Sequence, residues 1–274
     1  LRCLVGSEMC IRDRANKQVA EFCGHHKVNG RAVRRTMVYR VHDVPNEEKL
    51  EKFRTFVLRF GYVFKADKGR AVAKEMNKLL GQAKGRIEEN VISNLAVRAM
   101  SKAFYSTDNI GHYGLAFPYY THFTSPIRRY PDLQIHRIIK ENLRGRLNEN
   151  RIEHYDKILP EVAKQCSDRE RLAEETEREV VKMKKAEYMR MHIGEEYEGV
   201  ISGVTKWGIY VELPNTVEGL VHVVDLRDDH YNFIEQTYEM VGEHTGKTYK
   251  LGEKVRVRVS DADKLLRTIN FELA

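Results

Sequence analysis

The stretch Tyr119-Tyr120-Thr121-His122-Phe123-Thr124-Ser125-Pro126-Ile127-Arg128-Arg129-Tyr130-Pro131-Asp132 decides which fold we expect this 274-residue chain to adopt. It gathers aromatic and imidazole rings beside two adjacent guanidinium groups, and its prolines restrict the backbone. Arg128 or Arg129 can make bidentate hydrogen bonds to phosphate oxygens, and a helix that starts at Pro131 would point its free amides the same way. The alternative is a structural loop in which an arginine stacks on a tyrosine.

Helical patterns flank this stretch on both sides. Upstream, Pro45 and two acidic residues open a helix whose apolar side chains recur at three- and four-residue steps, and Gly61 offers a left-handed stop. Downstream, apolar residues are spaced along a charge-rich segment that ends at Gly194. We predict an extended segment near residues 38–41 and helices near 47–60, 72–80, 87–95 and 160–191.

From Gly194 onward the pattern changes from helical to strand-like. The predicted strands are residues 197–204, 208–213, 219–223, 254–259 and 266–273. Five short strands in about 80 residues favour a small Greek-key barrel of the OB type. The predicted fold class is therefore α+β, with a helix-rich part followed by an all-β OB-fold barrel.

These patterns divide the chain into three regions. Residues 15–193 form the helix-rich part and residues 194–274 form the barrel. Residues 1–14 show no sustained hydrophobic period and no cap that leads into the next segment. We interpret them as a non-native leader, such as a translated adapter sequence, or else as a disordered one, and we leave them out of the fold.

The charge of the chain is divided unevenly. The 47 Lys and Arg against 40 Asp and Glu give a net charge of +7, which favours a polyanionic partner. Residues 195–274 contain 9 basic and 15 acidic residues, a balance of −6, so the remaining 38 basic and 25 acidic residues carry +13. An acidic barrel cannot hold RNA mainly by neutralising phosphates, so its rings and a few local cations would have to do so.

Other features narrow the class of protein. No apolar run approaches the roughly 20 residues of a membrane-spanning helix, so we expect no membrane contact. The four cysteines lack metal-ligand or disulfide spacing, which is typical of reduced thiols in a cytoplasmic protein.

The run from His112 through Arg137, with His122-Phe123-Thr124-Ser125-Pro126-Ile127-Arg128-Arg129-Tyr130 at its centre, resembles the signature of the ribonuclease II and ribonuclease R (RNB) family. Tyr39-Arg40-Val41-His42-Asp43 resembles an upstream segment of that family. Residues 203–211 and 218–222 resemble the S1-type RNA-binding domain that follows its catalytic domain. The resemblance therefore covers essentially residue 15 to the end, as the C-terminal half of the RNB catalytic domain plus the S1-type domain.

This resemblance implies a processive 3′-to-5′ exoribonuclease of the ribonuclease R type that hydrolyses RNA to nucleoside 5′-monophosphates. The family's chemistry depends on magnesium held by a cluster of aspartates, and two-metal hydrolysis explains that requirement. The cluster lies in an earlier part of the family's sequence, so we expect no metal ligand here. We therefore interpret the chain as a truncated fragment that binds RNA weakly and does not hydrolyse it.

The resemblance also assigns roles to particular residues. Arg128 matches the family arginine beside the scissile phosphate, and Glu177 matches a glutamate near the active site, with a solvated helix glutamate as the alternative for Glu177. Trp207 and Tyr210 would present rings to bases, with core packing as their alternative. The further residues predicted to contact RNA are Tyr120, Phe123, Ser125, Arg129, Tyr130, His222 and Arg256 or Arg258.

A second class of function stays open from the sequence. The missing aspartates and the complete barrel pattern also fit a non-catalytic RNA-binding module, which we would expect to associate with the ribosome. In either class the expected partner is single-stranded or structured RNA.

Overall fold

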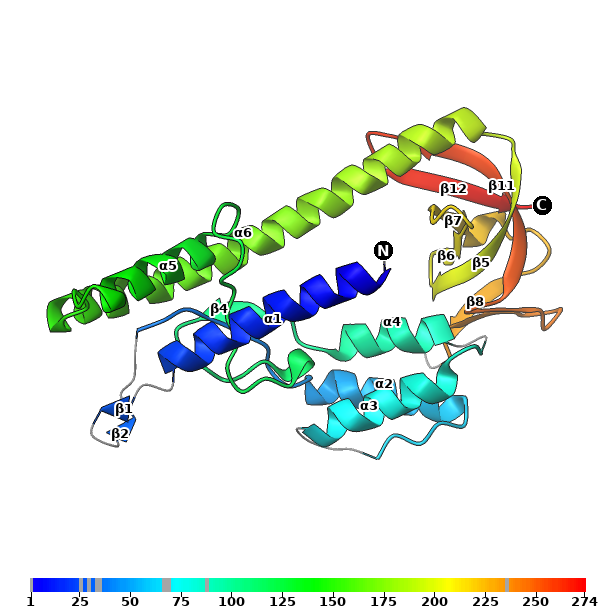
Figure 1. Cartoon of the computed structure of the whole chain (residues 1–274). Helices are drawn as coiled ribbons and strands as arrows, with labels where there is room; N and C mark the ends of the chain where they lie inside the picture. The colour runs from blue at the N-terminus through cyan, green and yellow to red at the C-terminus, as the bar shows by residue number, and fades with distance from the viewer. Residues whose placement is uncertain are drawn as a thin grey trace. The chain divides into compact units, whose positions relative to one another are not determined.

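The computed structural model describes residues 2–24, 27–28, 31–32, 36–65, 70–86, 89–234 and 237–274 (Figure 1). They form two compact units. The first comprises Leu1–Leu50, Ala66–Lys74 and Ala99–Ala173, and the second comprises Glu51–Lys65, Glu75–Arg98 and Glu174–Ala274. The second unit takes in helical segments from earlier in the chain as well as the barrel predicted from residue 194 onward.

The first unit is built around a small two-stranded sheet. Strand β3 (Tyr39–Val41) pairs antiparallel with β4 (Phe104–Ser106), with Arg40 opposite Tyr105. The extended segment predicted at residues 38–41 is thereby confirmed, whereas β4 was not predicted. The other elements of this unit are α1 (Arg2–Gly24), β1 (Lys27–Val28), β2 (Arg31–Ala32), η1 (Tyr113–Leu115), α5 (Tyr130–Leu143) and the first part of α6 (Glu149–Met189).

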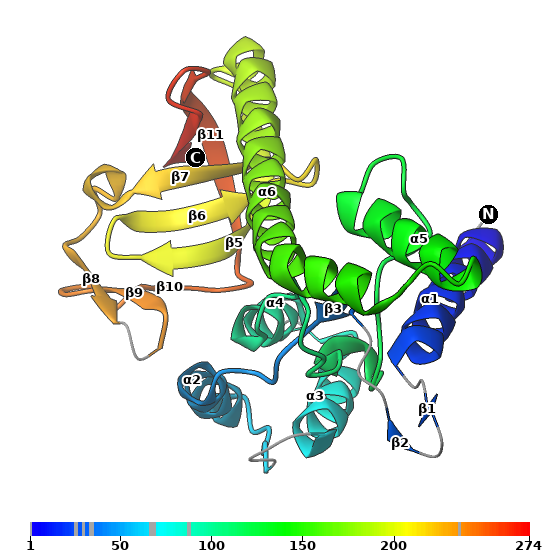
Figure 2. The ribbon, with the colours of Figure 1, turned by 90° about the vertical axis from the view of Figure 1, so that its left-hand side faces the viewer.

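Two apolar clusters lie on opposite sides of β3. Tyr39 and Val41 pack with Ile135 of α5 and with residues of α1, whereas Val38 packs with Ile138 of α5 and with α6. Successive side chains of an extended segment point to opposite faces, so Val38, which directly precedes β3, faces one cluster while Tyr39 and Val41 of β3 face the other. Figure 2 shows α1, α5 and the start of α6 in the same part of the molecule as β3.

Helix α6 begins eleven residues earlier than we predicted. The prediction placed its start near Pro160, but the helix starts at Glu149 and Pro160 lies inside it. Asn148 caps the first turn, since its Oδ1 accepts a hydrogen bond from the backbone N of Arg151 at 3.0 Å. Tyr155 and Leu159 are buried one turn apart, so tertiary packing offsets the hydrogen bond that a helix-interior proline removes.

Helix α1 overturns the expectation that residues 1–14 lie outside the fold. The helix runs from Arg2 to Gly24 without interruption. The Asp13 carboxylate accepts a hydrogen bond of 2.6 Å from the Tyr120 hydroxyl, and the neighbouring Asn16 is buried. Sequence periodicity missed the role of Asp13 and Asn16 because their hydrogen-bond partners, Tyr120 and Phe123, lie about a hundred positions away in the sequence.

Besides the end of α6, the second unit contains α4 (Glu89–Ala99) and most of α2 (Glu47–Arg59) and α3 (Arg70–Ala83), which begin within the first unit. Helix α2 ends as predicted, with Gly61 at a φ of 80°, and Phe56 is buried whereas Phe60 is exposed. Helix α3 continues through Gly81, and Ile87, where the third helix was predicted to start, lies outside the described residues.

Across the described ranges, no helix combines the length and the apolar character needed to cross a bilayer.

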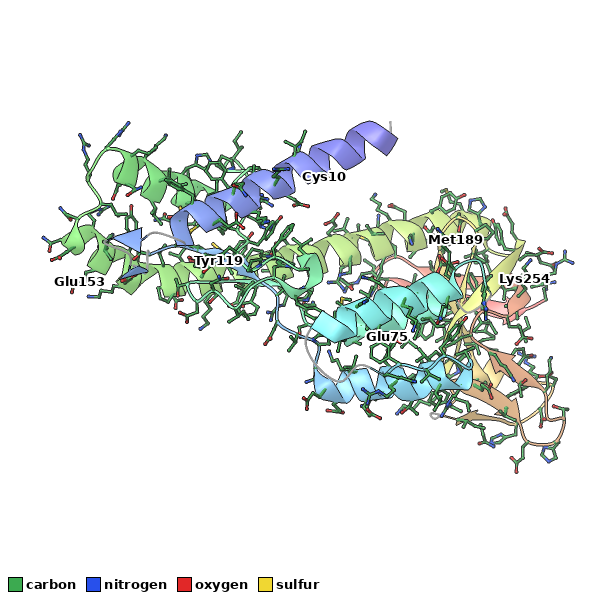
Figure 3. All side chains as sticks on the ribbon, turned by 60° about the horizontal axis from the view of Figure 1, so that its bottom comes forward. Cys10, Glu75, Tyr119, Glu153, Met189 and Lys254 are labelled. Atoms are coloured by element: carbon green, nitrogen blue, oxygen red, sulfur yellow. The ribbon has the colours of Figure 1, made fainter. Side chains whose placement is uncertain are left out.

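The C-terminal part of the second unit is a closed five-stranded barrel in the order β11-β12-β7-β6-β5 (Figure 2). Its strands are β5 (Glu196–Thr205), β6 (Gly208–Glu212), β7 (Glu218–His222), β11 (Lys254–Asp263) and β12 (Thr268–Leu273), which confirms the predicted barrel. Neighbouring strands are antiparallel except β12 and β7, which pair in parallel and close the barrel. Met189, near the end of α6, is buried in the barrel core (Figure 3).

A second sheet interrupts the barrel and was not predicted. It consists of β8 (Tyr231–Ile234), β9 (Glu239–Gly242) and β10 (Thr248–Lys250), inserted between β7 and β11 after the turn η3 (Val223–Asp225). The Asp229 carboxylate, just before β8, accepts hydrogen bonds from Thr245 and His244 in the loop between β9 and β10. These bonds join the two loops at one end of the sheet. These bonds, those from Thr245 above all, lower the pKa of Asp229.

Candidate nucleic-acid interface

The loop that leads into α5 is held by one buried carboxylate. Asp132 is 0% exposed, and its Oδ1 accepts a hydrogen bond of 2.7 Å from the backbone N of Ser125. The same oxygen accepts bonds from Nη2 and Nε of Arg129 at 2.8 and 3.2 Å. Oδ2 has no hydrogen-bond partner in the part of the chain that the structure describes. A buried carboxylate is stable only when paired in this way, so the first turn of α5 and the loop are fixed to each other.

The two adjacent arginines lie in different environments. The Arg129 side chain is 19% exposed and is committed to Asp132. Arg128 is exposed, and among the described residues its guanidinium has neither a hydrogen bond nor an ion pair. Backbone bonds from both arginines to the Ser125 carbonyl form the turn that separates the two side chains. Arg128 is therefore the residue of the pair that can bind an external anion.

The rings of the loop also divide between structure and surface. Phe123 is half-buried and stacks on His136, with centroids 4.1 Å apart and planes 5° apart. Tyr130 is 47% exposed, and the Arg137 guanidinium lies 5.9 Å from the centre of its ring. Ser125 is half-buried. Of these residues, Tyr130 presents the most open ring beside Arg128.

Tyr120 acts within the fold rather than at the surface. It is 4% exposed, and its hydroxyl donates to Asp13 and accepts a bond of 3.2 Å from the side-chain amide of Asn16. Asn16 also accepts a bond of 2.9 Å from the backbone N of Phe123. Burial and the bond to Asp13 raise the pKa of Tyr120 to about 12. Helix α1 therefore positions the loop through Tyr120.

A neutral histidine lies among the cations of this region. Nδ1 of His122 and the Tyr105 hydroxyl are 2.8 Å apart, and Arg40 stacks over the Tyr105 ring while pairing with Glu170. Burial, together with the positive charges of Arg129 and Arg40, lowers the pKa of His122 to about 3. The imidazole is therefore uncharged at neutral pH.

Glu177 lies on α6 in the second unit. Its side chain is exposed and makes no hydrogen bond or ion pair with a described residue. This environment is that of a solvated helix glutamate, the alternative that the sequence left open.

The barrel presents three of the predicted ring residues on its surface. Trp207 lies in the β5–β6 turn and is 57% exposed, with the Lys206 Nζ atom 4.8 Å from its ring centre, so core packing is excluded for this residue. Tyr210 pairs with Leu220 and is half-buried. His222 pairs with Gly208 of β6, which lies two residues from Tyr210. Because side chains two residues apart on a strand point to the same face, Tyr210 and His222 share the outer face of the sheet.

The predicted cations of the barrel have an acidic neighbour. Arg256 and Arg258 lie on one face of β11, and both approach Glu196, at 3.2 and 2.7 Å. Both are more than half exposed, so a phosphate could reach them only in competition with the Glu196 carboxylate.

A metal centre would need several clustered donors. Within the described ranges, no group of three or more His, Cys, Asp and Glu side chains lies close enough to hold a metal ion. These residues therefore do not fit a magnesium site of the kind that the resemblance implies.

Sequence reasoning missed the residues that hold the interface in place. Asp132 was assigned no functional role from the sequence, although its three-residue spacing from Arg129 is typical of an ion pair. Asp13 was excluded with the leader. The ion pair between Arg40 and Glu170 joins residues 130 positions apart, and no local signal could reveal it.

Two family models match the chain. The RNB domain matches residues 6–145, and the S1 RNA binding domain matches residues 190–273. Ribonuclease R 1 of Lactococcus lactis is 43% identical over 235 residues, which cover 86% of this chain and 29% of that protein. The chain thus spans about a third of the length of such relatives.

Solved structures share the fold. Mycoplasma genitalium RNase R, determined in complex with ribose-methylated single-stranded RNA, superposes with a TM-score of 0.85 at 27% identity, over 96% of this chain and 40% of that one. Yeast Ssd1, described as a pseudonuclease, superposes with a TM-score of 0.64 at 26% identity, over 85% of this chain and 29% of that one.

The pKa of His122 leads to a testable pH dependence. Its folded value, about 3, lies below the value near 6.5 of an unfolded histidine. Above pH 6.5 neither state binds the proton. Below it the unfolded chain does and the folded chain does not, so stability falls as the pH is lowered from 6.5 towards 3. We expect His122 to account for a loss of at most about 2 kcal/mol between pH 6.5 and 5.

The measurement is the NMR shift of the imidazole Cε1–H proton, together with urea unfolding at pH 7 and 5. The His122 signal should not titrate above pH 4.5. The matched control is His154→Gln, a substitution at an exposed position of α6. The His122→Gln variant should lose less stability on acidification than both the unsubstituted chain and this control. A normal titration of His122 near pH 6.5 would contradict the assignment.

Proposed function

Because the chain belongs to the RNB family, with ribonuclease R proteins among its relatives, we propose that it is the RNA-gripping part of a processive 3′-to-5′ exoribonuclease. The complete enzyme would hydrolyse RNA to nucleoside 5′-monophosphates, and this chain would correspond to the back half of its catalytic domain followed by an S1-type domain. The observation that carries the proposal is the free Arg128 guanidinium on a loop fixed by Asp132.

Arg128 suits the part of phosphate ligand for a physical reason. Phosphoryl transfer places developing negative charge on the oxygens of the scissile phosphate, and a fixed cation stabilises that charge without reorganising. The hydrogen bonds that Ser125 and Arg129 donate to Asp132 fix the loop on either side of Arg128. The Arg128 guanidinium has no ion pair with a described residue, so its charge is available to the substrate.

The barrel would hold the RNA strand further along by different means. Trp207 and Tyr210 offer rings on which bases can stack, and stacking is tolerant of sequence. The barrel region is acidic, and its arginines on β11 are shared with Glu196, so phosphate contacts would contribute less there. Single-stranded RNA is therefore the substrate form that the barrel fits best.

Magnesium belongs to the proposed chemistry of the complete enzyme. Two metal ions would activate the attacking water and stabilise the leaving oxygen. Since the described residues contain no suitable donor cluster, we propose that the ligands come from residues outside them. A cytoplasmic location and ribosome association stay predictions.

The second candidate is an RNA-binding protein without nuclease activity. The observation that favours it is the shared fold of yeast Ssd1, whose description as a pseudonuclease means that this architecture occurs without catalysis. The free Arg128 would then bind phosphate but stabilise no transition state.

Incubation with RNA tests the proposal. We expect this chain to bind a single-stranded RNA labelled at its 5′ end and to leave its length unchanged, with or without magnesium. A longer form that carries an aspartate cluster upstream should shorten the same RNA from its 3′ end only when magnesium is present. Absence of magnesium-dependent cleavage by that longer form would favour the non-catalytic candidate, and cleavage by this chain would show that it holds metal ligands itself.

Substitution of Arg128 tests its role directly. In the longer form, Arg128→Ala should lower kcat/KM for RNA by about 100-fold or more, the magnitude typical for loss of one charge-stabilising group. The matched control is Arg169→Ala, an exposed arginine of α6, which should leave the rate within about twofold. Equal rates for the two variants would refute the role of Arg128.

The exposed indole of the barrel gives a further prediction. Trp207→Ala should weaken RNA binding by about 1–3 kcal/mol, the range for one base stacked on an aromatic ring, without lowering the melting temperature. Tyr188→Ala removes a comparably exposed ring at the end of α6 and should leave the affinity unchanged. The measurement is fluorescence anisotropy with a labelled oligonucleotide, and unaltered affinity of the Trp207 variant would exclude stacking at this position.

A further inference from the structure

Helix α5 carries a row of exposed basic side chains. Arg137 and Lys140 are three residues apart on one face of α5, and Arg144, the residue directly after the helix, follows Lys140 by four positions. Ile135 and Ile138 are buried on the opposite side, against the two apolar clusters of the first unit. These three basic residues, the basic row, therefore face solvent over the second half of the helix and its C-terminal end.

The acidic residues of α5 do not neutralise this row. Asp132 is buried and paired with Arg129. Glu141 is paired with Arg151 of α6 at 2.6 Å and also accepts a hydrogen bond of 3.0 Å from the Tyr155 hydroxyl. Each carboxylate is thus committed to a residue outside the row.

The basic row itself makes no ion pair with any described residue. Among the described residues, the Arg137 side chain has a hydrogen bond of 3.5 Å to the Tyr130 hydroxyl and lies over the Tyr130 ring, and Arg146 adds a further exposed cation after the end of the helix. Oppositely charged pairs at three- or four-residue spacing stabilise a helix, and the row forms no such pair with a described residue. Uncompensated like charges in a row repel each other, and a polyanion would relieve that repulsion.

The row is continuous with the Arg128 loop. Tyr130 is the first residue of α5 and follows Arg128 by two positions, and Arg137 lies over its ring. Positions 130 and 137 are seven residues apart, so their side chains lie almost directly above one another along the helix, and position 144 follows after a further seven residues. Figure 2 shows α5 as a straight helix beside α1 in this unit.

We propose that Arg137, Lys140 and Arg144 form a phosphate track that binds the RNA backbone as it leaves the nucleotide held at Arg128. This inference rests on the proposed function, because it takes RNA as the ligand of the Arg128 loop. It adds a second contact surface within the first unit, separate from the barrel.

The dimensions of the helix limit which RNAs can use the track. From Tyr130 to Leu143 the helix rises about 20 Å at 1.5 Å per residue, and Arg144 follows it directly. A stacked strand, with a phosphate about every 3.4 Å, would need about six nucleotides to cover that length. RNAs of two or three nucleotides should therefore contact Arg128 without reaching the far end of the row.

The test compares two triple variants with matched charge changes. In the first, Arg137, Lys140 and Arg144 are replaced by Gln. In the control, three exposed basic residues of α6 in the same unit, none of them ion-paired with a described residue, are replaced by Gln: Lys157, Lys164 and Arg169. Arg128→Ala is measured in parallel, and circular dichroism melting checks that all variants fold.

The readout is the salt dependence of binding to a labelled single-stranded RNA of about 20 nucleotides. Loss of three phosphate contacts should reduce the slope of log K against log salt by about 2, since each contact to a single strand contributes about 0.7. The α6 control should change the slope by less than about 0.5. The Kd for a trinucleotide should respond to Arg128→Ala and not to the α5 variant.

The possible outcomes separate the two ideas. If Arg128→Ala weakens binding and the α5 variant behaves like the α6 control, the track is overturned and the proposed function stands. If the α5 variant alone lowers the salt slope, the track is supported and the role of Arg128 fails. If the unsubstituted chain binds no RNA at low salt, both are overturned.

Discussion

The buried carboxylate of Asp132 is the constraint on which the candidate site depends. Its Oδ1 joins the backbone of Ser125 to the guanidinium of Arg129, and so it fixes the loop at two points on either side of Arg128. Removing a charge from water is costly, and only a paired arginine with further hydrogen bonds makes such burial stable. One arginine of the adjacent pair is thereby used for structure, which leaves the other free. Without the Asp132 hydrogen bonds, the loop would present two mobile arginines and no defined anion site.

The same division between structural and available charge recurs through the first unit. Arg40 is committed to Glu170 and Arg151 to Glu141, while Arg137 and its neighbours on α5 have no acidic partner among the described residues. The surrounding cations and burial keep His122 neutral, so it adds no further charge of its own. Arg128 and one face of α5 therefore carry positive charge that no described carboxylate pairs with and that a polyanion can reach.

The barrel complements this unit with different chemistry. Its net negative region offers rings instead of free cations, and the exposed Trp207 and the half-buried Tyr210 and His222 occupy positions that the strand register assigns to the outer surface. Stacking on a ring is possible for every base, and contacts to phosphates carry no information about the base sequence. Both kinds of contact suit the proposed binding of RNA irrespective of its sequence.

Local pattern was sufficient for much of the architecture and for the identity of the central loop. Strand alternation placed the five barrel strands, the proline before Asp132 placed the start of α5, and the motif around Arg128 identified the RNB family. Long-range packing decided the rest. The start of α6 lies before Pro160 because Tyr155 and Leu159 are buried by residues distant in sequence, and α1 includes the first residues because Asp13 and Asn16 meet the loop near Tyr120. Which arginine of an adjacent pair is free, and whether a ring is buried or exposed, depends on partners that local spacing does not encode, so only the tertiary structure could decide them.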